Sequence, residues 1–296
     1  MRRFFVLSIL MASFVLSASA QKTISIEGAD EVVRLWDNST AKYSNYETRD
    51  ETFLNSKKSS IIQSSSCELY IFKAAQEKNT GIAVILYPGG GYFKLNFRVS
   101  MARWYASQGI TCALVKYRLP HYGHYDATLE DATSALRYLR TRTDLGINPA
   151  MVGVSGSSAG GHLGAWVSNI MPDDEKPAFA VLLYPWIDLA VSTSSPERIA
   201  LKELLGKGYK SKQIEKVTMY NLVTTTTSPT LLLLCDDDET VWPAGAAMYY
   251  EALINHGVKA SMHIFPFGGH SVSKHKAEYQ PLILDWLKYL GLMEKK

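Results

Sequence analysis

The stretch MVGVSGSSAGGHL, residues 151–163, carries a serine between glycines at the point where a β-rich run gives way to small residues. Only Ser158 fits the pattern G-x-S-x-G, with Gly156 and Gly160 at its flanks. The pattern requires glycine there because the serine occupies a sharp strand-to-helix turn, where a Cβ atom at either flank would collide. The two neighbouring serines fail the same test, since each would need a glycine where serine stands.

A flexible glycine-serine loop could have a similar sequence. The flanking residues distinguish such a loop from a strand-turn-helix motif that carries a nucleophile. MVGVS, residues 151–155, contains β-branched residues and is bounded by Pro149 and Gly156. AGGHLGAWVSNI, residues 159–170, has helical length. Strand, turn and helix in that order are what the motif requires, so we predict that Ser158 is a nucleophile.

Apolar runs of strand length alternate with helical patterns from residue 81 onward. The predicted strands are 82–87, 111–117, 151–155, 179–184, 230–235 and 261–265, and further helices are predicted near 99–107, 129–141, 245–255 and 281–290. This alternation predicts an α/β fold, with a mostly parallel central sheet and helices on both faces. Thr128 and Asp131 match a capping box, which predicts that the second of these helices begins at Leu129.

Residues 1–20 have the features of a secretory signal peptide. A basic start at Arg2 and Arg3 precedes an apolar run at 4–15 and small residues at 18–20. The apolar run is too short to span a bilayer, and no cysteine follows it for lipid attachment. We therefore expect cleavage before Gln21 and a secreted or periplasmic protein without stable membrane insertion.

The remaining residues, 21–296, are expected to form a single α/β domain. Residues 21–80 mix short β-prone pieces with polar, turn-rich sequence, which predicts an N-terminal arm and antiparallel edge strands. Residues 190–228 break the alternation of strands and helices with polar sequence. We interpret them as an insertion over the strand ends that could act as a lid.

Composition and charge argue against several classes of function. The formal net charge is +3, and removing residues 1–20 lowers the basic residues from 31 to 29, against 28 acidic ones. No stripe of Lys and Arg with interleaved aromatic residues is present, so nucleic acid is not an expected partner. No His, Cys or Asp cluster has the spacing of a zinc or calcium site, and we expect neither a metal nor a cofactor.

The three cysteines, Cys67, Cys112 and Cys235, are too few for a disulfide scaffold, and their odd number leaves at least one free thiol. All three lie in or at the end of β-prone segments. We therefore predict buried, unreactive thiols. The sequence does not decide whether two of the three cysteines form a disulfide.

A serine hydroxyl needs a base and a group that orients the base. With this type of elbow, the order along the chain is nucleophile, acid, histidine. Asp236–Asp238 and His270 follow two of the predicted strands directly, at the sheet edge where open α/β sheets place their sites. On this reasoning each of the three aspartates is a candidate acid, and His275 is the rival base. His162, four residues after Ser158, is expected to support packing.

The run PGGGY, residues 88–92, follows the strand predicted at 82–87 and provides candidates for an oxyanion hole. Glycines let backbone N–H groups approach a ligand, and each preorganised donor contributes on the order of 3 kcal/mol to transition-state stabilisation. The predicted donors are the amides of Gly90 and Gly91, with that of Ala159 after the nucleophile. Nucleotide binding is disfavoured because neither G-x-G-x-x-G nor G-K-[ST] is present.

Large rings follow two of these motifs. Tyr92 and Phe93 come directly after the glycines, and Trp242 follows the aspartate run. We expect such rings to crowd the space around the nucleophile, with Tyr92 and Trp242 as substrate-binding residues. A crowded acyl pocket favours acetyl groups, and aromatic rings near a cleft also suit sugars.

The motifs YPGGGY, VKYRLP, GSSAGGHL, LLYP, DDDETV and GGH, in that order, resemble the secreted bacterial α/β-hydrolase esterases that include acetylxylan esterases and related carbohydrate esterases. The resemblance covers residues 81–292 and implies an α/β-hydrolase fold and a serine esterase. In that family the acid lies three residues before a valine, which implies Asp238, with Val241. The chain departs from the family at Trp242, where proline is frequent, at Ser157, where an aromatic residue or histidine is frequent, and in NFRVS, which lacks the usual acidic-glycine pair.

The expected function is hydrolysis of short-chain acetyl esters through an acyl-enzyme, on a small-molecule or carbohydrate substrate such as xylan. One alternative is a serine peptidase of the prolyl-oligopeptidase type, which shares the elbow and the triad order. Such peptidases usually carry a large N-terminal propeller, for which residues 21–80 are too short. The other alternative is a hydrolase-fold binding protein without catalysis, and the presence of all three triad residue types argues against it.

Overall fold

The computed structural model describes residues 23–189 and 195–293 of the 296-residue chain. The predicted signal peptide, residues 1–20, lies outside the described residues. None of the helices in the described ranges is long and apolar enough to cross a membrane.

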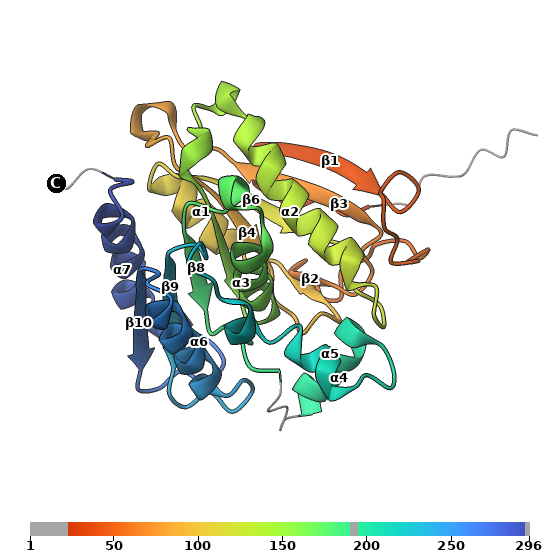
Figure 1. Ribbon diagram of the computed structural model, residues 1–296. Helices are drawn as coiled ribbons and strands as arrows, with labels where there is room; N and C mark the ends of the chain where they lie inside the picture. The colour runs from red at the N-terminus through yellow and green to blue at the C-terminus, as the bar shows by residue number, and fades with distance from the viewer. Residues whose placement is uncertain (1–22, 190–194, 294–296) are drawn as a thin grey trace, which may run out of the picture.

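An eight-stranded sheet forms the centre of the molecule (Figure 1), in the order β1-β3-β6-β4-β7-β8-β9-β10. The strands are β1 (Glu31–Asp37), β3 (Ser66–Phe72), β4 (Ala83–Tyr87), β6 (Thr111–Lys116), β7 (Val152–Ser157), β8 (Ala180–Leu183), β9 (Thr230–Cys235) and β10 (Ala260–Phe265). All neighbours from β6 to β10 are parallel, whereas β1 and β3 are antiparallel additions at one edge. The mostly parallel sheet is confirmed, and its antiparallel strands β1 and β3 come from residues 21–80.

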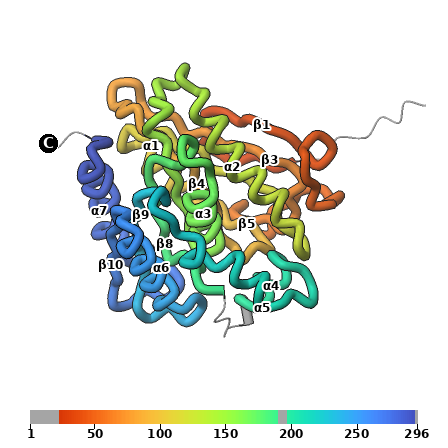
Figure 2. Tube along the Cα trace, viewed as in Figure 1, coloured from red at the N-terminus to blue at the C-terminus, as the bar shows by residue number. Residues whose placement is uncertain are grey.

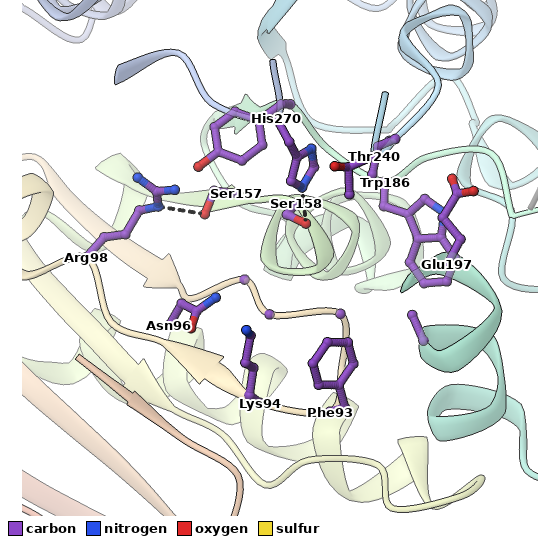
Figure 3. Close-up of a pocket in the computed structure, with 16 residues that line it drawn as sticks. Phe93, Lys94, Asn96, Arg98, Ser157, Ser158, Trp186, Glu197, Thr240 and His270 are labelled. Atoms are coloured by element: carbon purple, nitrogen blue, oxygen red, sulfur yellow. Dashed lines mark hydrogen bonds between the residues drawn. The ribbon is translucent and has the colours of Figure 1, made fainter. Parts of the chain in front are cut away.

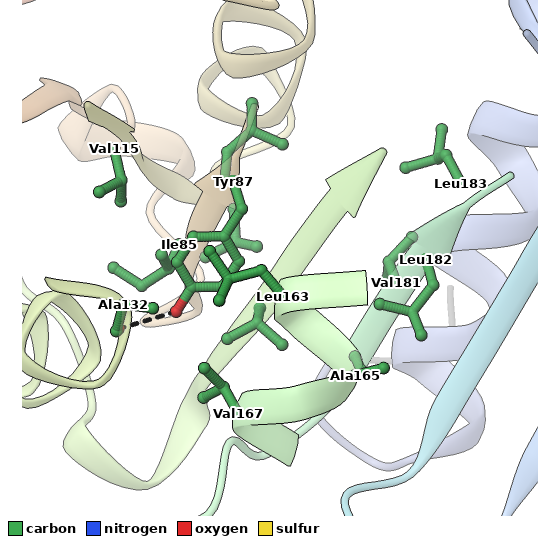
Figure 4. Packing of buried hydrophobic residues seen from close by; sticks show 14 of the residues in the cluster. Ile85, Tyr87, Val115, Ala132, Leu163, Ala165, Val167, Val181, Leu182 and Leu183 are labelled. Atoms are coloured by element: carbon green, nitrogen blue, oxygen red, sulfur yellow. Dashed lines mark hydrogen bonds between the residues drawn. The ribbon is translucent and has the colours of Figure 1, made fainter. Parts of the chain in front are cut away.

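Helices cover both faces of this sheet (Figure 1). On one face lie α2 (Tyr125–Thr141), α3 (Ala159–Ile170) and α6 (Pro243–Asn255), and on the other lie α1 (Val99–Ser107) and α7 (Lys276–Tyr289). Strand β4 is buried along its whole length because both of its faces are covered. Leu163 and Val167 of α3 contribute to the core beside Tyr87, whose hydroxyl donates a 2.9 Å hydrogen bond to the carbonyl of Ala132 in α2 (Figure 4).

Shorter elements complete the chain. A second, two-stranded sheet pairs β2 (Ser60–Ile61) with β5 (Leu95–Asn96). The described part of the predicted insertion contains α4 (Ser195–Leu205) and α5 (Ser211–Glu215). Single 3-10 turns lie at Gln76–Lys78, Thr143–Leu145, Pro149–Met151, Asp173–Glu175, Met219–Leu222 and Ser273–His275.

The predicted start of the second helix is wrong. Helix α2 begins at Tyr125, so Thr128 and Asp131 lie inside it and form no capping box. Both side chains are buried and face the sheet instead. Thr128 donates to the carbonyl of Arg118, and Asp131 accepts hydrogen bonds from the Arg118 guanidinium and the Trp36 indole. A buried arginine needs such partners, and it draws both polar side chains away from the helix end.

All three cysteines, Cys67, Cys112 and Cys235, are free and buried. Burial raises the pKa of each thiol above its usual value. The prediction of buried thiols is therefore confirmed, and the disulfide that the sequence left open is absent.

A buried ion cluster fastens the N-terminal arm to the sheet. The Lys116 ammonium at the end of β6 lies 2.5 Å from a carboxylate oxygen of Glu51 and 2.9 Å from one of Glu68. All three side chains are shielded from solvent. Glu68 also pairs with the Arg34 guanidinium, but burial of the Glu51 carboxylate depends on the lysine, since an unpaired buried charge is costly.

Replacing Lys116 with Met should lower the free energy of unfolding by about 3–5 kcal/mol, because it leaves the buried Glu51 carboxylate without its cation, whereas Glu68 keeps its pair with Arg34. Urea denaturation at neutral pH measures the effect. Lys73→Met is the matched control, since Lys73 is 40% exposed in its ion pair with Glu31, and it should cost less than about 1 kcal/mol. Equal losses in the two variants would show that the buried cluster contributes no more than a surface pair.

Candidate active site

The site lies where the strand order of the sheet reverses. Strand β4 has β6 on one side and β7 on the other. The glycine loop, residues 88–94, follows β4, and Ser158 follows β7, so both lie at the carboxyl edge of neighbouring parallel strands. Open α/β sheets bind ligands at such a reversal.

Ser158 occupies a left-handed backbone conformation, with φ 55° and ψ −124°. A Cβ atom at Gly156 would lie 2.1 Å from the carbonyl oxygen of Gly160, and one at Gly160 would lie 2.2 Å from that of Tyr87. Both flanks of the turn therefore exclude any side chain. This close packing confirms the predicted strand, turn and helix around Ser158, and the strain is of the kind found at functional sites.

Ser158, His270 and Asp238 form a continuous chain of hydrogen bonds. The Oγ atom of Ser158 lies 2.8 Å from Nε2 of His270 (Figure 3), and Nδ1 of His270 lies 2.7 Å from Oδ2 of Asp238. A carboxylate only accepts, so Nδ1 carries the proton and Nε2 is free to accept from the serine. The other oxygen of Asp238 accepts the backbone N–H groups of Thr240 and Val241. A nucleophile, a base and an orienting acid are thus in line.

Asp237, one of the two rival acids, and His275, the rival base, have other partners. Asp237 accepts hydrogen bonds from the N–H groups of Gly268 and Gly269, and these bonds lower its pKa. It thereby shapes the turn that presents His270. His275 is buried, and its Nε2 lies 2.6 Å from the carbonyl oxygen of Phe267. Neither side chain is bonded to Ser158 in the structure.

The glycine loop approaches the nucleophile closely. A Cβ atom at Gly89 would lie 2.4 Å from the carbonyl oxygen of Ser157 and 3.1 Å from Cβ of Ser158. Gly90 and Gly91 have φ values of 133° and 62°, which favour glycine. Their N–H groups donate no hydrogen bond to any described residue.

A third candidate donor lies beside these glycines. Ala159 is the first residue of α3, so its N–H has no carbonyl acceptor earlier in the helix. The geometry leaves the amides of Gly90, Gly91 and Ala159 available, and their role as an oxyanion hole stays a prediction.

The N-terminal arm holds the glycine loop from outside, a role that its sequence does not reveal. Ser60 and Ile61 of β2 pair with Asn96 and Leu95 of β5. The N–H of Asn96 then donates a 2.8 Å hydrogen bond to the carbonyl of Gly89. Figure 2 shows this arm, in red to orange, running back to β5.

A pocket of about 350 Å³ opens at Ser158. Its size is at the lower end of ligand pockets. It is lined by Gly89, Gly90, Gly91, Phe93, Lys94, Asn96, Arg98, Ser157, Ser158, Tyr184, Trp186, Glu197, Ala200, Thr240, Val241 and His270. Arg98 lies at one end and Trp186 and Glu197 at the other, with the nucleophile between them (Figure 3).

The two residues predicted to bind substrate are absent from this lining. Tyr92 has φ 60° directly after left-handed Gly91, and these two residues turn its ring beneath the loop, where it is fully buried. Trp242 precedes α6 and is 47% exposed, outside the pocket. Phe93 and Val241 line the pocket in their stead. Neither residue lines the pocket; for Tyr92 the reason is that the sequence does not reveal the direction of a side chain after a tight turn.

Several pocket residues were not singled out from the sequence. Tyr184 and Trp186 follow β8, so the rule that sites lie at the carboxyl ends of strands could have found them. Asn96 and Arg98 lie in the NFRVS segment, whose departure from the family pattern was the available signal. Glu197 belongs to α4, and no local pattern indicates that this helix reaches the pocket. Among the described side chains, no group of three His, Cys, Asp or Glu residues could hold a metal ion.

His162 connects the glycine loop with the insertion. Its Nδ1 lies 2.6 Å from the Tyr92 hydroxyl, and its Nε2 lies 2.7 Å from the carbonyl oxygen of Val217. Because a carbonyl only accepts, Nε2 carries the proton and Tyr92 donates to Nδ1. Burial lowers the pKa of His162 to about 4, so the ring is neutral at neutral pH. The expected packing role is confirmed.

This buried histidine should make the protein less stable in acid. Below the usual histidine pKa of about 6.5, the unfolded chain binds a proton at His162 that the folded protein does not bind. The free energy of unfolding should therefore fall as the pH drops from about 6.5 towards 4, by up to about 3 kcal/mol from this residue. His162→Gln should lose this contribution, which reduces the pH slope by about one proton in urea denaturation at pH 5–6. His256→Gln, at an exposed histidine, is the control, and an unchanged slope in His162→Gln would contradict the assignment.

Comparison with known proteins places the chain in a family. Residues 84–273 match the family model described as alpha/beta hydrolase fold. An acetylxylan esterase of Xylanibacter ruminicola is 34% identical over 206 residues, which cover 66% of this chain and 42% of that protein. A carboxylesterase of Mycobacterium tuberculosis is 32% identical over 109 residues, or 34% of each chain. The chain thus spans about two fifths of the length of the first relative and a third of the second.

A solved structure agrees over more of the molecule. The acetyl ester-xyloside bifunctional hydrolase of Caldicellulosiruptor lactoaceticus superposes with a TM-score of 0.70 at 28% identity, covering 85% of this chain and 97% of that one. The eight-stranded sheet, the glycine-flanked serine and the family match agree with the resemblance noted from the motifs. The chain belongs to the α/β-hydrolase family.

Proposed function

We propose that this protein is a serine esterase that forms an acyl-enzyme on Ser158. The observation that carries the proposal is the continuous chain of hydrogen bonds from Ser158 through His270 to Asp238. A binding protein without catalysis would have no need of this alignment. The names of the relatives, acetylxylan esterase and carboxylesterase, support the same activity.

The reaction follows from the atoms in place. His270 Nε2 takes the proton of Ser158 Oγ as that oxygen attacks the ester carbonyl. The negative charge then develops on the carbonyl oxygen, within reach of the amides of Gly90, Gly91 and Ala159. The protonated His270 gives its proton to the departing alcohol. A water molecule, deprotonated by the same nitrogen, then releases the acid and restores Ser158.

Asp238 acts through His270 and does not itself take the proton. Its carboxylate keeps Nδ1 protonated and stabilises the imidazolium that forms during each half of the reaction. The backbone N–H groups of Thr240 and Val241 hold its second oxygen. The acid therefore stays charged and correctly oriented while His270 changes its protonation state.

We propose acetyl esters of carbohydrates as the substrate class. The pocket is small, and the two relatives named for acetyl esters support a short acyl group. Phe93 and Trp186 offer ring faces, and Glu197 and Asn96 offer side chains that can hydrogen-bond to hydroxyl groups. We further propose that the enzyme is exported, because residues 1–20 match a cleavable signal peptide; the mature protein would then begin at Gln21.

Substitution of the triad tests the mechanism. Ser158→Ala should lower turnover of 4-nitrophenyl acetate by on the order of 10⁴ or more while the protein stays folded, because the base then has no nucleophile to activate. His270→Ala should be about as damaging, since triad members act as a unit. Asp238→Asn should cost orders of magnitude, and more than Asp237→Asn. Ser155→Ala is the control, and near-normal turnover in Ser158→Ala would refute the assignment.

The proposed substrate is tested by varying each half of the ester. We expect kcat/KM to fall from acetyl to butyryl to octanoyl aryl esters, because a chain too long for the pocket clashes with its walls. Acetate should be released from acetylated xylo-oligosaccharides, and Trp186→Ala should reduce that release more than it reduces aryl acetate hydrolysis. A preference for octanoyl esters would contradict the short acyl group. Activity on aryl acetates alone would contradict the carbohydrate, and cleavage of peptides in their place would favour the peptidase alternative.

A further inference from the structure

Arg98 presents a positive charge to the pocket without an acidic partner. It lines the pocket beside Ser157 and Ser158, and its Nε donates a 3.1 Å hydrogen bond to the Ser157 hydroxyl (Figure 3). No ion pair joins it to an acidic side chain of the described residues. The two terminal nitrogens of Arg98 make no hydrogen bond to any residue that the structure describes. A guanidinium offers five N–H donors, so most of them are left for a ligand.

A second donor without a partner lies beside this guanidinium. The guanidinium carbon of Arg98 lies 5.4 Å from the centre of the Tyr184 ring. Tyr184 is 3% exposed and lines the pocket, and its hydroxyl lies near the Ser157 side chain but makes no well-formed hydrogen bond with any side chain or backbone group of the described residues. Buried hydroxyl groups are normally satisfied, so an unsatisfied one at a pocket wall points to a ligand atom.

The Asp238 carboxylate, which bonds His270, also acts on Tyr184, but the cavity surface beside Arg98 is basic. A small second cavity, of about 90 Å³, lies against Arg98 and Ser157, and its lining includes Lys276 and no acidic residue. Glu197 is the acidic side chain of the main pocket lining, and Figure 3 places it at the opposite end from Arg98. An anionic group would therefore be attracted to the Arg98 end of the pocket.

The nucleophile is close to these donors. The Tyr184 ring packs edge-on against the His270 ring at 4.9 Å, with Arg98 near the same tyrosine. Arg98 is also bonded to Ser157, which directly precedes Ser158. A group bound here would lie within a few bonds of the scissile ester.

We propose that Arg98 and Tyr184 form a subsite for a carboxylate on the substrate, so that the enzyme prefers esters carrying a negative charge near the scissile bond. The guanidinium matches a carboxylate through paired hydrogen bonds, and the tyrosine hydroxyl supplies a further donor. The carboxylate belongs either to a uronic acid on the alcohol side or to a dicarboxylic acyl group. This inference rests on the proposed esterase function and adds the charge of its substrate.

The test compares each carboxylate with its neutral amide of the same shape. One pair is a monoacetylated methyl glucuronoside and its uronamide, and the other is 4-nitrophenyl hydrogen succinate and the corresponding succinamate. Wild-type kcat/KM should favour the carboxylate in one of the two pairs. That pair shows whether the carboxylate lies on the alcohol or on the acyl group of the substrate. Arg98→Gln should reduce that preference by roughly ten- to a hundredfold, the value of a charge-assisted pair of hydrogen bonds. Tyr184→Phe, which keeps the ring, should reduce it less.

Controls separate this inference from a structural role and from the esterase proposal. Arg103→Gln removes the same charge outside the pocket, where Arg103 bonds the carbonyl of Glu27, and should retain the preference. Calorimetric binding of the two glucuronosides and of succinate and succinamate to the Ser158→Ala protein measures charge selection without turnover. If the wild-type protein did not hydrolyse aryl acetates, that result by itself would refute the esterase proposal. Equal affinity in the Ser158→Ala protein and equal wild-type kcat/KM for carboxylate and amide in both pairs would overturn the subsite, and so would a preference that persists in Arg98→Gln.

Discussion

The left-handed backbone at Ser158 is the constraint on which the rest of the site depends. A nonglycine residue with φ 55° is strained, and it persists only where its surroundings hold it. Gly156 and Gly160 permit the sharp turn, and Gly89 lets the neighbouring loop close on it. The same turn directs the serine hydroxyl toward His270 and leaves the first amide of α3 beside it.

Distant parts of the chain keep the facing groups in position. The N-terminal arm adds β2 to the strand that closes the glycine loop, and Lys116 fastens that arm through buried carboxylates. Asp237 binds the glycine turn before His270, while Asp238 binds the imidazole itself. His162 ties the underside of the glycine loop to the insertion. Each catalytic candidate is thus held by hydrogen bonds from another element, as preorganised sites require.

Much of this arrangement could be predicted because its signals are local. The glycines around Ser158 and the placement of His270 after a strand are readable as short patterns, and the parallel sheet brings their carboxyl ends together. Spacing alone left three adjacent aspartates open, since only the structure shows that Asp238 bonds His270. The direction of Tyr92 was missed because two successive left-handed residues reverse it. Arg98 was missed because its importance depends on what it does not contact, which no sequence pattern contains.

The central claim is that Ser158 is the nucleophile that His270 activates. The most direct measurement is labelling with a dialkyl aryl phosphate, followed by mass spectrometry of the proteolysed protein. We expect one phosphoryl group per chain, located on Ser158, with loss of esterase activity in proportion to labelling, and no labelling of His270→Ala on the same time scale. A label on Ser157 or another serine, or full esterase activity in a fully labelled protein, would contradict the account.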